Sequence, residues 1–212
     1  MTNAYDRAGY GRIPIEFGQR PAVLAVDFQA SHIDPRHPFG GRPLALRALE
    51  NSIDVVKAAR ANGIPVAVCY TEYHHRDEMP YWSLATVDQD NSDGNLRGSP
   101  ASVLDPRITD RDYDHVVRKT GPSMFYETTV QMFLTKNQVD TVIVTGVNTS
   151  GCIRATVIDS FQRGYRTVVP EDCVGDLEQQ EHDDNIRDMR RRYSRISSAA
   201  EVIDYLKRCK RS

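Results

Sequence analysis

The sequence lacks an excess of basic residues, a long apolar run and closely spaced cysteines. Its 27 Lys and Arg stand against 29 Asp and Glu, for a formal net charge of -2, so nothing indicates binding to nucleic acid or an anionic membrane. No run approaches the roughly 20 apolar residues that span a bilayer, and residues 1–20 hold no signal-peptide core. We therefore expect a soluble, cytoplasmic protein.

The cysteines form no CxxC pair; they are Cys69, Cys152, Cys173 and Cys209. This spacing fits neither a disulfide framework nor a zinc knuckle, so we expect reduced thiols. Residues 146–151 begin and end with glycine, but no Lys-Ser or Lys-Thr pair follows them as in a phosphate-binding loop. The sequence therefore predicts no nucleotide cofactor.

Apolar, β-branched runs alternate with amphipathic segments along the chain. The runs predict buried strands at residues 22–28, 64–70, 115–119, 141–144 and 166–170. The amphipathic segments predict helices at residues 44–62, 124–137, 152–161, 182–192 and 199–207. Such alternation predicts one α/β domain with a parallel sheet over residues 21–212, preceded by a polar arm at residues 1–20.

Cys152 lies where a predicted strand passes into a helix. Residues 141–144 are followed by the small, polar turn 147–151, which leaves room for a substrate to approach. A cysteine is most often a small buried hydrophobe. On the first turn of a helix, however, unpaired N–H groups and the helix dipole favour a thiolate, so we expect a lowered thiol pKa and a reactive Cys152.

Two further reactive side chains stand at strand ends: Asp27 after the first strand and Lys119 after the third. The carboxyl ends of parallel strands share one edge of a sheet, so both can converge with Cys152. A carboxylate there can take the thiol proton, and an ammonium group can hold the carboxylate and thiolate charged. The thiolate would then attack a carbonyl carbon.

Three segments that occur in this order, AVLAVDFQ, VVRKTGPSMFYET and VIVTGVNTSGCIRATVIDS, resemble the isochorismatase-like cysteine hydrolases. The tail VVPEDCVGDLEQQEHDDNIRDM is similar to their N-carbamoylsarcosine amidase-like branch. The resemblance covers nearly all of Pro21 to Leu206. It implies a three-layer sandwich with a central, mostly parallel sheet. It also implies C–N hydrolysis of a small amide, carbamoyl or ureido compound through a thioester, releasing ammonia or an amine.

On this resemblance, Asp27 is the general base, Lys119 its electrostatic partner and Cys152 the nucleophile. The family's oxyanion hole joins the N–H of the nucleophile to one exposed by a cis peptide four residues earlier, which corresponds to Val147–Asn148. Family members commonly form dimers or tetramers in which loops of one subunit close the site of the next. We expect a homo-oligomer, with segment 71–105 as the first candidate for the closing loop and the arm as the second.

One residue departs from the family pattern. Enzymes of this branch commonly carry Gly-Asp-Arg, whose arginine pairs with a substrate carboxylate, where this chain has Gly175, Asp176 and Leu177. An unpaired carboxylate in a desolvated pocket is costly. We therefore expect a neutral substrate, with an apolar or aromatic tail resting on Leu177, Tyr126 and Trp82.

Other functions within and beyond this chemistry stay open. A nicotinamidase- or maleamate amidase-type amidohydrolase is the alternative. The metal-binding loop of nicotinamidases places an aspartate two residues before a histidine, whereas this chain has Glu72 before His74, and we expect no metal. His32, His37 and Asp34 could also be considered as metal ligands, but they fit a solvated loop equally well. Isochorismatase itself cleaves a vinyl ether and does not need a thiol, so the presence of Cys152 disfavours that activity. A non-catalytic isochorismatase-like module would have no use for three converging reactive groups.

Overall fold

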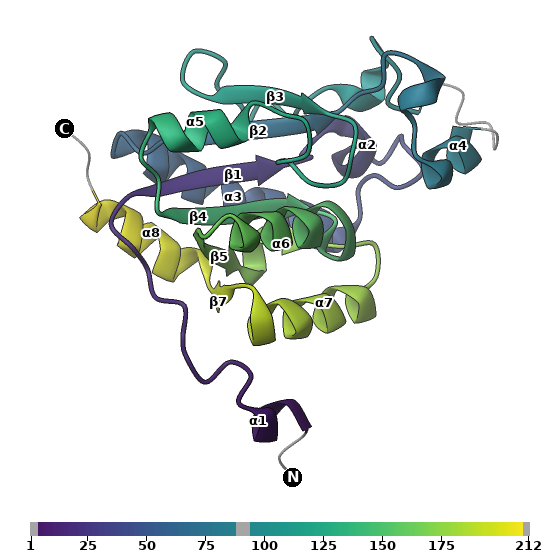
Figure 1. Ribbon diagram of the computed structural model, residues 1–212. Coiled ribbons are helices and arrows are strands. Elements are labelled where there is room, and N and C mark those ends of the chain that lie inside the picture. The colour runs from purple at the N-terminus through teal and green to yellow at the C-terminus, as the bar shows by residue number, and fades with distance from the viewer. Residues whose placement is uncertain (1–3, 88–93, 210–212) are drawn as a thin grey trace.

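A parallel sheet lies between two helical layers in the computed structural model, which describes residues 4–87 and 94–209 (Figure 1). Its strands are β1 Pro21–Val26, β2 Val66–Thr71, β3 His115–Lys119, β4 Thr141–Val147, β5 Arg166–Pro170, β6 Val174–Gly175 and β7 Arg195–Ser197. Its α-helices are α1 Ala4–Ala8, α2 Ala30–Ile33, α3 Pro43–Ala61, α4 Tyr81–Val87, α5 Val130–Lys136, α6 Arg154–Gln162, α7 Gln179–Arg192 and α8 Ala199–Arg208. The predicted three-layer α/β class is confirmed.

The strand order is β3-β2-β1-β4-β5-β7, with β6 beside β4. β1 pairs in parallel with both β2 and β4, and β2 with β3. The carboxyl ends of β1, β3 and β4 therefore meet at one edge of the sheet. The close approach of β4 to β1 requires a glycine at position 146, because a Cβ on Gly146 would lie 2.0 Å from the carbonyl oxygen of Val26.

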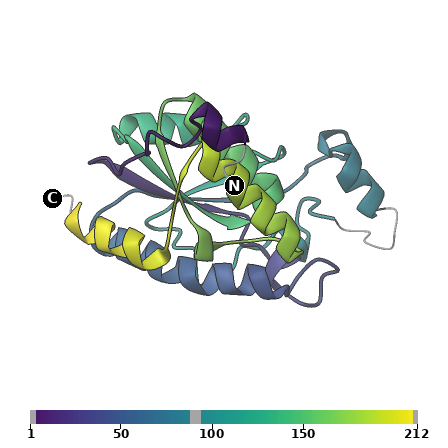
Figure 2. The ribbon, with the colours of Figure 1, turned by 90° about the horizontal axis from the view of Figure 1, so that it is seen from below.

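The two faces of the sheet build two separate cores (Figure 2). Along β1, Val23 and Ala25 pack toward α3 and α8, whereas Ala22, Leu24 and Val26 pack toward α5, α6 and α7. This alternation follows from the two-residue period of a strand. It also explains why residues 22–26 are all apolar, since both faces of the strand are covered.

The described structure corrects several predicted elements. The helix expected over residues 124–137 begins only at Val130, because Glu127 takes a positive φ of 51° and the Thr128 hydroxyl bonds back to the carbonyl of Met124. β6 and β7 were not predicted, since two and three residues give no readable periodicity. The loop expected over residues 71–105 contains α4; its residues 88–93 lie outside the described structure.

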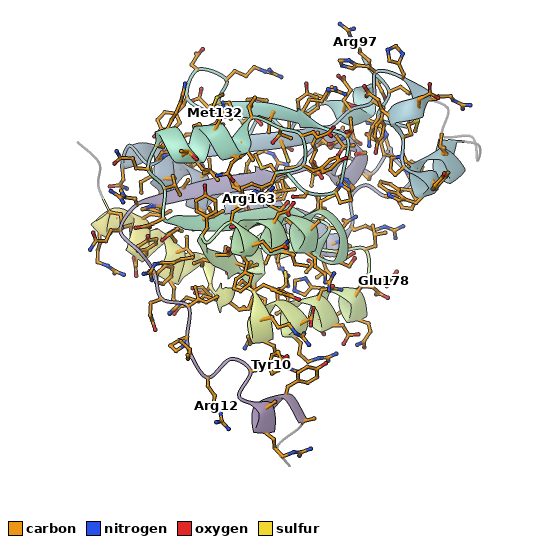
Figure 3. The ribbon with its side chains drawn as sticks, viewed as in Figure 1. Tyr10, Arg12, Arg97, Met132, Arg163 and Glu178 are labelled. Carbon is orange, nitrogen blue, oxygen red and sulfur yellow. The ribbon has the colours of Figure 1, made fainter. Side chains whose placement is uncertain are left out.

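The amino-terminal arm leaves the body of the molecule beside the carboxyl end of α7 (Figure 1). Tyr10 and Arg12 stand on it in Figure 3. The arm is not isolated, because the guanidinium of Arg191 lies 4.6 Å from the Tyr5 ring centre and that of Arg192 5.2 Å from the Tyr10 ring centre. Within residues 4–87 and 94–209, every helix is too short or too polar to cross a membrane.

Candidate active site

Asp27 follows directly on β1 at the common edge of the strand ends. Its φ of 56° turns the chain out of the strand, while its N–H still donates to the carbonyl oxygen of Cys69 at 3.1 Å. The carboxylate is fully buried. One of its oxygens lies 3.5 Å from the Thr71 hydroxyl and 3.6 Å from the Cys69 thiol, both of which donate to it. The strand end thus fixes a buried carboxylate in one orientation.

Lys119, the last residue of β3, reaches this carboxylate. Its Nζ lies 2.8 Å from Asp27 Oδ2, and the two side chains are 1% and 0% exposed. Nζ also donates to Thr71 Oγ1 at 2.9 Å and to the Gly121 carbonyl oxygen at 3.2 Å. Burial by itself would lower the pKa of Lys119. The charge and hydrogen bond of Asp27, together with the charges of Cys152 and Cys69, outweigh burial and raise the pKa above its ordinary value. The lysine is therefore a permanent cation.

Cys152 completes the cluster, with its Sγ 3.4 Å from Lys119 Nζ. It lies in a π-helical turn, Thr149–Ile153, that precedes α6. Two contacts from the carboxyl-terminal part of the chain hold this turn. The N–H of Ser150 donates to Asp176 Oδ2 at 2.6 Å, and Thr149 Oγ1 bonds His182 Nδ1 at 2.9 Å.

The expected lowering of the Cys152 pKa is wrong. Burial raises the pKa of Cys152 to about 12, with the charge and hydrogen bond of Asp27 opposing ionisation further and Lys119 favouring it. The physical reason is that desolvation beside a carboxylate outweighs the dipole of a helix, which begins only at Arg154. The resting thiol keeps its proton, so a nearby base has to remove it.

A cavity of about 340 Å³ opens onto the three side chains. Trp82, Asn148 and Leu177 line it, as the sequence analysis expects of residues that meet a substrate. Asn148 follows a cis peptide bond from Val147, which is itself buried in β4. Tyr126 does not line the cavity: its ring lies beside Gly121 and is 55% exposed, because the irregular segment before α5 turns it outward.

Several lining residues were missed by sequence reasoning, among them Ser31, His32, Thr71 and Asp176. His32 was treated as a solvated loop residue, yet it lies on α2 in the cavity wall. Asp176 was noticed only as a neighbour of Leu177. A signal for Thr71 existed, since it directly follows the predicted strand 64–70 and so stands at a strand end, as Lys119 does.

The described residues bring no three potential metal ligands together. Glu72 and His74 do form a pair, with 3.3 Å between Oε2 and Nε2. Glu72 is otherwise used by the chain, because its Oε1 accepts the N–H of Gly98 at 3.3 Å. The two residues thus form a contact within the loop that follows β2.

Comparisons with known proteins identify the family and the fold. A family model described as the isochorismatase domain matches residues 21–201. The chain is 31% identical over 211 residues to an N-carbamoylsarcosine amidase of Arthrobacter sp., covering 97% of this chain and 78% of that protein. It is 30% identical over 196 residues to the maleamate amidohydrolase of Pseudomonas putida, covering 91% and 90%. An isochorismatase family protein from Desulfovibrio vulgaris has the same fold, with a TM-score of 0.81 at 23% identity over 89% of this chain and 99% of that one.

Proposed function

The chain belongs to the isochorismatase family, and from this premise we propose that it is an amidohydrolase in which Cys152 attacks a small amide, carbamoyl or ureido substrate. The observation that carries the proposal is the contact of one lysine ammonium with both a buried carboxylate and the thiol, at 2.8 and 3.4 Å. Both curated relatives are named as enzymes of amide hydrolysis. The four unpaired cysteines suit the reducing cytoplasm.

In the proposed reaction, Asp27 takes the proton from Cys152 while Lys119 stabilises the thiolate. The sulfur bonds to the carbonyl carbon, and the carbonyl oxygen becomes an oxyanion held by the N–H groups of Asn148 and Cys152, both at the cavity wall. The C–N bond then breaks, and Asp27 returns its proton to the leaving nitrogen. Water attacks the thioester, gives a proton to Asp27, and the carboxylic acid leaves as the thiol is restored.

The proposal is tested with a panel of primary amides, carbamoyl compounds and ureas, scored for ammonia release by the purified protein. We expect release from at least one class. A complete absence of hydrolysis would favour a non-catalytic module. Hydrolysis of a vinyl ether to an alcohol and a carbonyl compound, with no amide turned over, would favour isochorismatase chemistry.

We further propose that the substrate is uncharged where it meets Leu177. Of the described cavity wall, the only lysine is Lys119, which is paired with Asp27, and no arginine is present. Asp176 offers no help to an anion, because its oxygens are hydrogen-bond acceptors, here of the N–H groups of Ser150 and Leu177. A substrate carboxylate would thus be desolvated without a cation of its own.

Succinamide and succinamate form a matched neutral and anionic pair for this prediction. We expect wild type to prefer succinamide. Leu177→Arg should shift kcat/KM toward succinamate by roughly 10- to 100-fold, since hydrogen bonds to a charged group contribute about 1.5–3 kcal/mol. Val103→Arg, at a 60% exposed position outside the cavity, adds the same charge as a control. A wild type that prefers succinamate, with Leu177→Arg leaving that preference unchanged, contradicts the role of Leu177.

We also propose a homo-oligomer, a tetramer or a dimer, in which α4 is an interface. Tyr81 is 93% exposed and Trp82 is 60% exposed although it lines the cavity, so this aromatic pair remains uncovered within one chain. Light scattering should give a multiple of the 24.0 kDa chain mass. Tyr81→Asp should shift the protein toward the monomer, whereas Met132→Asp, an equally drastic change at an exposed residue of α5, should not (Figure 3). A monomeric wild type at working concentration would refute the assembly.

A further inference from the structure

Among the polar side chains of the cavity wall that have no role in the chemistry proposed above, Ser31 and His32 are adjacent in the chain. Ser31 and His32 lie on the single turn of α2, four and five residues beyond Asp27, and both line the cavity. Ser31 Oγ and His32 Nδ1 are buried, and neither has a hydrogen-bond partner among residues 4–87 and 94–209. Buried polar atoms of native proteins are nearly always paired, so these two call for an explanation.

Their place in the cavity supplies one. The neighbouring wall is apolar and includes Phe39, Trp82, Pro122 and Leu177, which suits the carbon skeleton of a small ligand. Asp27, Lys119 and Cys152 are occupied with one another at the strand ends. In the described wall, Ser31 and His32 are therefore adjacent polar groups left to bind another part of the ligand.

We propose that Ser31 and His32 form a second polar subsite, which binds an uncharged group of the substrate other than the scissile amide. This group both donates and accepts a hydrogen bond, as a hydroxyl or a second carboxamide does. A serine hydroxyl can do either, and a neutral imidazole nitrogen can accept or, in the other tautomer, donate. The inference rests on the proposed amidohydrolase function and adds the substrate class to it.

The charges around His32 favour a neutral ligand group. Burial lowers the pKa of His32 below its ordinary 6.5; the charges of Asp27 and Asp176 oppose this effect and that of Lys119 adds to it. Because a lowered histidine pKa means that the ring is neutral at neutral pH, His32 is not a substitute for the missing arginine. A carboxylate bound there would meet no full positive charge except the one already shared with Asp27.

Matched amides test the subsite through a ratio. The probes are butyramide against 4-hydroxybutyramide and succinamide, and benzamide against 3-hydroxybenzamide and isophthalamide. We expect wild type to prefer the members with the second polar group. Ser31→Ala and His32→Phe should each reduce that preference in kcat/KM by about 3- to 10-fold, the loss expected for one neutral hydrogen bond. His32→Gln, which keeps a donor and an acceptor, should retain more of it than His32→Phe.

Two controls separate this effect from damage to the fold. Ser102→Ala removes another buried, unpartnered hydroxyl that lies outside the cavity, and His75→Gln changes an exposed histidine; neither should alter the ratio. An unchanged ratio in Ser31→Ala and His32→Phe, with simple amides still hydrolysed, would overturn the subsite and leave the amidohydrolase intact. A preference for succinamate that grows as the pH falls, and disappears in His32→Phe, would instead make His32 a cation for an anionic substrate. If no amide of any kind releases ammonia, the proposed function fails and the subsite with it.

Discussion

Cys152→Ser should fold like wild type and lose amide hydrolysis by at least about a thousandfold in kcat/KM. The serine hydroxyl is smaller than the thiol and can still accept from Lys119, which donates to Cys152 Sγ at 3.4 Å, so packing should change little. A hydroxyl is far harder to ionise than a thiol, and a carboxylate is too weak a base to activate it alone. Ammonia release and the thermal unfolding midpoint, measured on the same preparation, check both halves of the expectation.

Alkylation by iodoacetamide gives an independent measurement. Peptide mapping should find Cys152, which lines the cavity, modified faster than Cys69 and Cys173, which are both fully buried. Since the raised pKa of Cys152 leaves its thiol protonated at neutral pH, the rate should continue to rise as the pH increases above neutrality. An inert Cys152 together with full activity in Cys152→Ser would exclude a thioester mechanism.

The sheet was predictable from the sequence because its central strands are covered on both faces. Residues 22–26 and 142–144 are apolar without interruption, and the structure buries every residue of β1 and β4. Helix α3 was equally clear: its buried residues recur every three or four positions, and Gly63, with a φ of 67°, follows its end. In a parallel sheet the carboxyl ends of the strands lie at one edge. The sequence could therefore predict that Asp27 and Lys119 lie close together.

The features of the site that could not be predicted from the sequence depend on local backbone geometry and on how deeply a side chain is buried. The pKa of Cys152 follows from its burial beside Asp27, and no spacing of residues reports how far a thiol lies from water. Tyr126 was expected to contact the substrate, but the segment before α5 is irregular, with a positive φ at Glu127, and Tyr126 does not line the cavity. His32 looked like a loop histidine because α2 is only four residues long, too short to show a helical period.

Asp27 and Lys119 should act as one unit, and this is the second large effect. Asp27→Asn keeps the shape of the side chain and removes the base; Lys119→Met keeps most of the volume and removes the charge. Each should lower kcat/KM by about 10³-fold or more, and the double variant should be little worse than either one, because the base and its counter-ion contribute to the same step. If the logarithms of the two losses add, the residues work independently and the shared role is wrong.

A stability control is needed, because removing one partner of a buried ion pair leaves the other charge uncompensated and costs about 3–5 kcal/mol. The chain contains a suitable comparison away from the cavity. Arg60 Nη2 lies 2.6 Å from Asp114 Oδ2, with side chains 17% and 0% exposed. Asp114→Asn should lower the free energy of unfolding as Asp27→Asn does, yet leave kcat nearly unchanged below the unfolding transition. A fall in kcat as large as that of Asp27→Asn would mean that lost stability, and not the lost base, explains the inactivity.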